Sequence, residues 1–178
     1  IYLKTKSTHL KQEIQAFLVS PYLHKNQLTK TNAHQEVDAA KTTAMKKVLV
    51  LCTGNSCRSQ LAEGYLRHFH GEKANVYSAG VETHGVNPRA IATMKEDGID
   101  ISMHTSNHVD EYLHIPFDLI FTVCDHASER CPIFPSSAKR IHHNFTDPAK
   151  ATGSEAEIMA EFRRVREEIK EFCRTLEI

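Results

Sequence analysis

The stretch Lys46–Gln60 is the sequence feature that most constrains how this chain can fold. It begins with the apolar run Val48–Leu51, which predicts a buried strand, and Cys52 follows directly. After a short loop containing one glycine, apolar residues recur at helical spacing, namely Leu61, Ala62, Tyr65, Leu66 and Phe69. The sequence therefore predicts a strand, a short loop and a helix, with a cysteine where the loop begins.

A loop of this kind suits a tetrahedral oxyanion. Its backbone N–H groups can converge on one point, and the helix that follows adds the positive end of its dipole. That field would favour the thiolate of Cys52. Arg58, six residues later, can offer a planar fork of donors to the same anion. The alternative is that Cys52 and Cys57 are small buried apolar residues.

The Cys-x5-Arg spacing alone is not specific, because Cys124 and Arg130 repeat it after another apolar run. The residues between them include Asp125 and Glu129 and no glycine. These two carboxylates would repel an oxyanion, so we expect only the first match to form the cradle.

Composition narrows the function classes. The chain has 178 residues, enough for one domain with a core, and its 22 basic and 22 acidic residues cancel. No basic excess predicts a nucleic-acid or membrane surface, and no apolar run approaches the roughly 20 residues of a spanning helix. The five cysteines are widely spaced, which favours free thiols in a reducing cytoplasm. Neither zinc-ligand spacing nor a dinucleotide-binding glycine pattern occurs, so we expect no metal and no cofactor.

From Met45 onward, strand and helix patterns alternate, which predicts a single α/β domain with a four-stranded parallel sheet. The predicted strands are Lys46–Leu51, Asn75–Ser78, Phe117–Val123 and Lys139–His142. The predicted helices after the first are one over Ala90–Asp97 begun by Asn87-Pro88, a short one capped by Thr105 or Ser106, and a terminal one carrying Ile158, Phe162, Val165, Ile169, Cys173 and Leu176.

Residues 1–44 differ from the predicted domain, 45–178. They contain six lysines against three acidic residues, and 26–43 hold almost no core residues. One short helix is expected between Ser7 and Pro21. We interpret residues 1–44 as a flexible extension.

The predicted topology brings thiols together. Cys52 and Cys124 follow parallel strands, so both leave the same edge of the sheet, where ligands bind. Cys131 lies seven residues further on. Hydrolysis of a phosphoester would need one cysteine, an arginine and a carboxylic acid. Reduction of the oxyanion itself would need further thiols to supply two electrons as a disulfide, a role that Cys124 and Cys131 fit.

Four motifs resemble those of the thioredoxin-coupled arsenate reductases, relatives of the low-molecular-weight protein tyrosine phosphatases. The resemblance covers residues 46–178. Its motifs are Val-Leu-Cys-Thr-Gly-Asn-Ser-Cys-Arg-Ser-Gln, Val-Tyr-Ser-Ala-Gly-Val-Glu-Thr-His-Gly-Val-Asn-Pro, Thr-Val-Cys with a later Cys-Pro, and Phe-Thr-Asp-Pro-Ala.

The resemblance implies a role for each matching residue. Cys52 is the expected nucleophile, Ser59 donates to its thiolate, and Asp147 is the general acid, although Asp147 before Pro148 also fits a simple turn former. Cys124 and Cys131 are the expected second and third thiols. The expected oxyanion cradle comprises Thr53, Gly54, Asn55, Ser56, Cys57, Arg58 and Ser59.

Two departures from common patterns matter. Some relatives hold a potassium ion with Asn, Glu, Ser and Asp; here Asn55, Glu63 and Ser78 match, but Asn107 replaces the Asp, which disfavours a cation site. Phosphatases usually have Pro after Arg-Ser and Tyr after Asp-Pro, whereas this chain has Gln60 and Ala149.

We therefore expect a cytoplasmic, monomeric reductase of arsenate with a phosphatase-like fold. Thioredoxin is its expected reductant, and phosphate and sulfate are the expected competing anions. The alternatives are a low-molecular-weight phosphatase and a non-catalytic redox-sensing protein that uses Cys124 and Cys131.

Removing residues 1–44 is expected to leave folding and activity nearly intact, because no motif residue lies there. The measurement is turnover and thermal unfolding of a chain that starts at Met45, beside the full chain. Loss of most of the activity in the shorter chain would show that the extension contributes to the domain.

Overall fold

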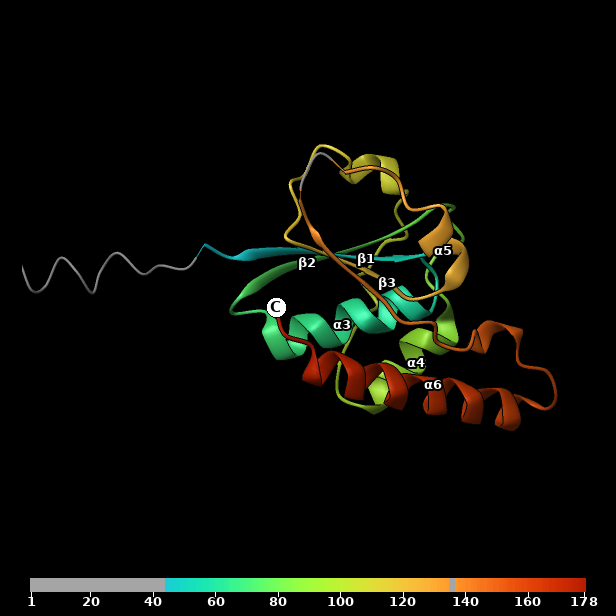
Figure 1. Ribbon diagram of the computed structural model, residues 1–178. Helices are drawn as coiled ribbons and strands as arrows, with labels where there is room; N and C mark the ends of the chain where they lie inside the picture. The colour runs from blue at the N-terminus through green and yellow to red at the C-terminus, as the bar shows by residue number, and fades with distance from the viewer. Residues whose placement is uncertain (1–43, 135–136) are drawn as a thin grey trace, which may run out of the picture. The chain divides into compact units, whose positions relative to one another are not determined.

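The computed structural model describes residues 44–134 and 137–178 (Figure 1). The predicted N-terminal extension and its short helix lie outside these residues. The elements, in chain order, are β1 (Lys46–Cys52), α3 (Arg58–His70), β2 (Ala74–Gly80), α4 (Pro88–Glu96), the 3-10 helix η1 (Val109–Tyr112), β3 (Leu119–Thr122), α5 (Asp125–Glu129), β4 (Lys139–His142), the 3-10 helix η2 (Pro148–Lys150) and α6 (Glu155–Thr175).

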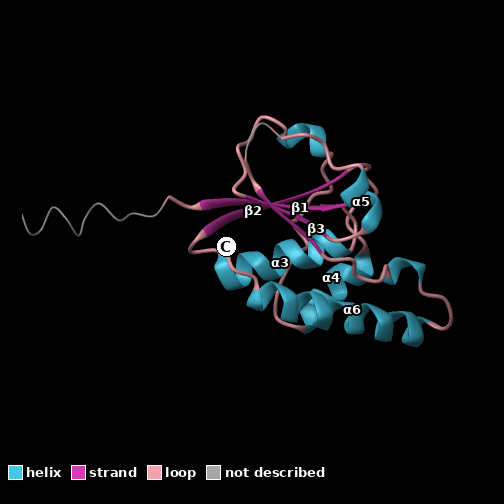
Figure 2. Cartoon of the chain, in the orientation of Figure 1, coloured by secondary structure: helices cyan, strands magenta, loops and turns pink. Residues whose placement is uncertain are grey.

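The four strands form one parallel sheet in the order β2-β1-β3-β4, which confirms the predicted fold class. Figure 2 shows α3, α4 and α6 together on one side of the sheet and the η1 loop on the other. This double cover explains the unbroken apolar run of β1, where all four residues of Val48–Leu51 are fully buried. Cys52 pairs in register with Gly80, so the ends of β1 and β2 lie side by side.

The helices begin where the sequence provides caps. Asn87 accepts a hydrogen bond from the Arg89 N–H at the start of α4. Ser154 and Glu157 form a reciprocal capping box at the start of α6. The apolar stripe of α6 is buried as predicted, at Phe162, Val165, Ile169 and Cys173.

Two local predictions were wrong. Thr105 and Ser106 cap no helix: His108 caps η1, while the Ser106 hydroxyl donates to the carbonyl of Gly54. No helix was predicted after β3, but Asp125–Glu129 forms α5. Five residues are too few for a helical period to show in the sequence.

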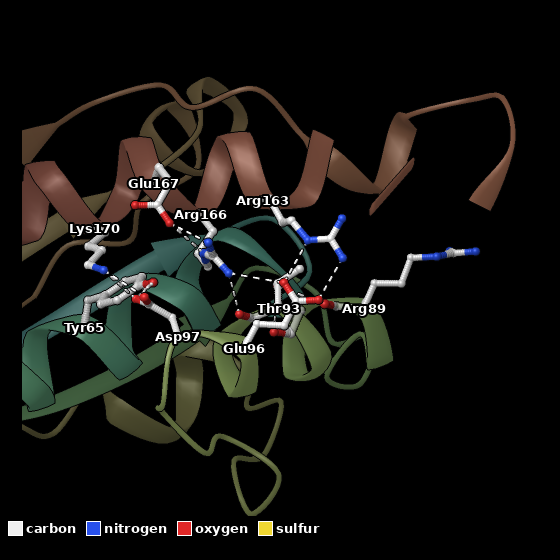
Figure 3. Close-up of polar contacts among 10 residues, drawn as sticks. Tyr65, Arg89, Thr93, Glu96, Asp97, Arg163, Arg166, Glu167 and Lys170 are labelled. Carbon is white, nitrogen blue, oxygen red and sulfur yellow. Dashed lines mark hydrogen bonds and ion pairs between the residues drawn. The ribbon is translucent and has the colours of Figure 1, made fainter. Parts of the chain in front are cut away.

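A polar seam joins α4 to α6 (Figure 3). Arg163 makes two hydrogen bonds of 2.8 Å to Glu96. At the end of α4, Asp97 accepts from Lys170 at 2.9 Å and from the Tyr65 hydroxyl at 2.7 Å (Figure 3). Burial raises the pKa of the Asp97 carboxyl, but these hydrogen bonds and the nearby cations outweigh burial and hold the pKa below its ordinary value.

Replacing Asp97 with Asn is expected to lower the free energy of unfolding by about 1–2 kcal/mol at neutral pH, because two hydrogen bonds lose their charged acceptor. A lowered folded-state pKa stabilises the protein above the ordinary carboxyl pKa, and this stabilisation is lost as the pH falls through the folded value. Denaturant unfolding at a series of pH values should therefore show a gap between wild type and variant that is constant near neutrality and closes in acid. Glu72→Gln is the matched control, since Glu72 makes no hydrogen bond or ion pair with any described residue. A gap that persists unchanged at low pH would contradict this account.

Candidate functional site

The backbone carbonyls of Cys52 and of the loop between β1 and α3 are held by hydrogen bonds from other segments. A neighbouring segment, residues 81–87, donates to four of them. The bonds run from Val81 N to Cys52 O (3.3 Å), Glu82 N to Thr53 O (2.9 Å), His84 N to Gly54 O (3.0 Å) and Asn87 N to Ser56 O (3.0 Å). The fifth carbonyl, of Asn55, accepts from the Gln60 side chain at 3.1 Å.

The loop's N–H groups are left free by this arrangement. No backbone N–H of residues 53–57 donates a hydrogen bond within the described part of the chain. With every carbonyl directed outward, the donors of the loop and the start of α3 face the opposite side. This is the electrostatic arrangement that binds an oxyanion, as the sequence predicted.

Asn55 shapes the loop from inside. Its φ of 45° lies in the left-handed region, which Asn tolerates better than most residues. Its fully buried side chain donates to Ser59 Oγ at 3.0 Å and to Ser78 Oγ at 2.8 Å, and accepts from the Asn107 N–H at 2.8 Å. Ser78 in turn donates to Glu63 at 2.5 Å. The side chains of this network therefore hold the loop against α3 and β2.

The same network bears on the cation site suggested by resemblance. Asn55, Glu63 and Ser78 lie together, but the Asn107 side chain is directed to Thr105 and Glu111 instead. Asn107 offers the network only its backbone N–H, a donor that cannot ligate a cation. The residues present do not fit a potassium ion. Within 44–134 and 137–178, no group of three or more His, Cys, Asp or Glu side chains is placed to hold a metal.

Two thiols share the anion pocket. Cys52 and Cys124 both line a cavity of about 710 Å³ at the carboxyl edge of the sheet. Thr53 Oγ1 lies 3.3 Å from Cys124 Sγ, so a residue of the cradle contacts the second thiol. Cys57 also lines this cavity, but burial raises the pKa of its thiol to about 12, which keeps it protonated at neutral pH.

Arg58 and Asp147 complete the pocket. The Arg58 guanidinium donates to Asp147 Oδ2 at 2.9 Å and to the Phe145 carbonyl at 3.2 Å, so it is fixed across the cavity. Asp147 Oδ1 accepts from Ala149 N and caps η2. Asp147 is therefore a turn former and a pocket residue at once. Ser59 Oγ accepts from Asn55, which leaves its proton free to donate.

Cys131 lies outside the anion pocket. It lines a separate cavity of about 120 Å³ beside β3 and β4, where Arg140 Nη1 donates to its Sγ at 3.1 Å. The structure therefore brings together Cys52, Arg58, Cys124 and Asp147 and keeps the third thiol apart. Arg130, the arginine of the second Cys-x5-Arg match, caps the end of α5 and belongs to no loop cradle.

Sequence reasoning missed two residues that shape the cradle. His84 packs on Gly54: a Cβ at Gly54 would lie 2.4 Å from His84 Nδ1. Gly80, at the end of β2, lies directly against the backbone of two other residues. A Cβ at Gly80 would lie 2.2 Å from the Glu82 carbonyl oxygen and 2.7 Å from the Thr53 carbonyl oxygen. The signal available for Gly80 was its place two residues after the predicted strand Asn75–Ser78.

Comparison with known proteins agrees with this geometry. The family model described as low molecular weight phosphotyrosine protein phosphatase matches residues 47–177, and the chain belongs to this family. The arsenate reductase of Halalkalibacterium halodurans is 52% identical over 130 residues, which cover 73% of this chain and 94% of that protein. The arsenate reductase of Bacillus subtilis is 50% identical, covering 73% and 96%.

A solved structure extends the comparison to three dimensions. A structure described as an arsenate reductase in the phosphate binding state superposes with a TM-score of 0.58 at 32% identity, covering 72% of this chain and 94% of that one. In the described part of the present chain, no helix has the length and apolarity needed to cross a membrane.

Replacing Gly80 with Ala is expected to weaken phosphate binding at least tenfold and to destabilise the fold by about 1–3 kcal/mol, because the new methyl would force the cradle backbone away from β2. Isothermal titration with phosphate and denaturant unfolding measure the two effects. Gly85→Ala is the matched control: its φ of 74° strains an alanine, but no atom lies within 4 Å of the new Cβ. Equal effects at the two glycines would contradict the explanation that the close approach of backbone makes Gly80 necessary.

Proposed function

We propose that this chain is an arsenate reductase that uses Cys52, Cys124 and Cys131 in succession. The single observation that carries the proposal is the presence of two thiols, Cys52 and Cys124, in one anion pocket, with a third thiol outside it. A phosphatase needs only the first. Relatives that are 50–52% identical over most of their length carry the name arsenate reductase.

The first step joins Cys52 to arsenic. Arsenate binds to the free N–H groups of residues 53–57 and to Arg58, since both are donors in a pocket of the right size. The Cys52 thiolate, assisted by the free proton of Ser59, attacks arsenic. Asp147 gives a proton to the arsenic-bound oxygen that departs, which leaves as water. A Cys52–arsenic bond has replaced an arsenic–oxygen bond, and arsenic remains arsenic(V).

The second step reduces arsenic. The thiolate of Cys124 attacks Cys52 Sγ, so that a Cys52–Cys124 disulfide forms and the sulfur–arsenic electron pair leaves with arsenic. Arsenic(V) becomes arsenic(III) and departs as arsenite, and two thiols have supplied two electrons. The contact of Cys124 with Thr53 supports this step because it keeps the second thiol beside the cradle.

The third step moves the disulfide outward. Cys131 attacks Cys124, which forms a Cys124–Cys131 disulfide and frees Cys52 as a thiolate. Residues 124–131, here named the redox segment, must change shape for this step. Seven residues along an ideal helix span roughly 10 Å, whereas disulfide-bonded Cα atoms lie about 4–7 Å apart. Because α5 occupies most of this segment, we infer that the helix opens.

We further propose that thioredoxin reduces the Cys124–Cys131 disulfide, which the opening of α5 would bring to the surface. All residues assigned to the reaction lie between Cys52 and Asp147, so we assign residues 45–178 as the catalytic unit. We place the enzyme in the cytoplasm, where free thiols persist.

Hydrolysis of phosphoesters is the second candidate function. Cys52, Arg58 and Asp147 meet in one pocket and are sufficient for a thiol–phosphate intermediate, and the family is described as a phosphatase family. We expect any such hydrolysis to be a side reaction of the same pocket, independent of Cys124 and Cys131.

The relay is tested by trapping its intermediates. With arsenate, thioredoxin and its reductase, the wild type should consume reducing equivalents continuously. Cys131→Ser should release about one arsenite per enzyme and stop as a Cys52–Cys124 disulfide, and Cys124→Ser should stop earlier as the arsenic adduct. Mass spectrometry identifies the trapped species.

Controls separate the candidate functions. Cys173→Ala, which removes a thiol buried on α6, should keep full turnover. Cleavage of p-nitrophenyl phosphate should survive in Cys124→Ser and Cys131→Ser and disappear in Cys52→Ser. Repeated turnover of arsenate by Cys131→Ser would show that Cys131 is not part of the relay. If the wild type hydrolyses p-nitrophenyl phosphate but does not reduce arsenate, the chain is a phosphatase.

A further inference from the structure

The edge strand β4 directs a row of polar side chains at the redox segment. Alternate residues of a strand point to the same face. Arg140 and His142 are two such residues of β4, and Asn144, two positions further on, continues the row. All three contact residues 124–131 or their immediate continuation, and we call them the polar row.

The row holds the redox segment at both ends. At the first residue of α5, Asp125 accepts from Asn144 Nδ2 at 2.6 Å, and its other oxygen lies 3.1 Å from His142 Nε2. At the far end, Arg140 contacts Cys131 Sγ at 3.1 Å and the Pro132 carbonyl at 3.5 Å. The rest of α5 lies between these two attachments.

His142 is itself fixed. Thr122 Oγ1 on β3 lies 2.9 Å from His142 Nδ1, so the Thr122 hydroxyl can donate to Nδ1 while Nε2–H donates to Asp125. The row is therefore anchored to the sheet, and in the described structure it contacts the segment while α5 is folded. Bringing Cys131 to Cys124 would pull Cys131 away from Arg140.

We propose that Arg140, His142 and Asn144 are positioning residues that hold the redox segment in its reduced, helical form and so set how readily the Cys124–Cys131 disulfide forms. The inference deepens the proposed function, since that disulfide is the relay's last product. Arg140 and His142 lie outside the anion pocket, whereas Asn144 lines its wall beside Asp125. They act through Asp125 and Cys131.

The test measures a thiol–disulfide equilibrium without arsenate. In a Cys52→Ser background, the two thiols of Cys124 and Cys131 exchange with oxidised glutathione, which takes up their two electrons and two protons to give two glutathione thiols. Mass spectrometry after alkylation gives the oxidised fraction at each glutathione ratio. Because arsenate is absent, the result stands whether or not the chain reduces arsenate.

Arg140→Gln and Asn144→Ala are each expected to shift the equilibrium toward the disulfide by roughly three- to tenfold, because each removes a charge-assisted contact made with the reduced, helical segment. Lys139→Gln is the matched control: it removes a cation from the same strand, and the Lys139 side chain makes no hydrogen bond or ion pair with any described residue. Its equilibrium should match that of the background.

A second measurement reads the segment directly. Hydrogen exchange at the Ser128 and Arg130 amides, which bond to Cys124 O and His126 O, should be faster in the reduced variants than in the reduced background. Asp125→Asn weakens the contacts with His142 and Asn144 by changing the residue of the segment instead. It replaces any variant of the polar row that does not fold. Equilibria within twofold of the Lys139→Gln value in Arg140→Gln and in Asn144→Ala, or a shift toward the thiols, would overturn the proposal.

Discussion

The outward direction of five consecutive carbonyls is the constraint on which this structure depends. A loop can offer its N–H groups to an anion only if its C=O groups find partners elsewhere, because buried backbone groups left unpaired are costly. Residues 81–87 provide four of these partners and Gln60 the fifth. The register that places Cys52 beside Gly80 brings this segment to the loop, and the missing side chain of Gly80 permits the close approach. The cradle is thus a property of two neighbouring strand ends rather than of the Cys-x5-Arg motif alone.

The charges beneath the cradle are balanced so that they do not oppose an anion. Glu63 is buried under the loop, but it accepts from Ser78 and pairs with Arg67 at 2.6 Å. His104 lies nearby, and burial lowers the pKa of its imidazole despite the charge of Glu63, which favours the neutral form near pH 7. The layer below the cradle therefore contributes hydrogen bonds with little net charge, and the cations Arg58 and Lys150 both line the pocket.

The features that were predicted correctly from the sequence depend on residues that are close together along the chain. The apolar run of β1, the amphipathic stripe of α6 and the cap at Asn87 depend on neighbours along the chain, and β4 was predicted at its observed bounds. The glycine and the uncharged residues of the first loop distinguished it from the segment after Cys124, because charge within a loop is also local. The need for Gly80 and the packing of His84 on Gly54 could not be predicted, since both arise from contacts between segments distant in sequence. For the same reason, spacing could bring Cys124 to the right edge of the sheet but could not place Cys131 in a separate cavity against Arg140.

The stability of helix α5 determines how easily the proposed disulfide step can take place. A helix of five residues gains few internal hydrogen bonds against the cost of fixing its first turn, so it does not persist by its own propensity. Backbone bonds at its two ends, from the Ser128 N–H to the Cys124 carbonyl and from the Arg130 N–H to the His126 carbonyl, span most of the redox segment. Its folded form must then rely on attachments from outside, which His142 and Asn144 supply at one end and Arg140 at the other. A longer, self-sufficient helix would hold Cys124 beside the cradle equally well, but it would resist the opening that a Cys124–Cys131 disulfide requires. The short α5 of this chain is therefore suited to the opening that the proposed Cys124–Cys131 disulfide requires.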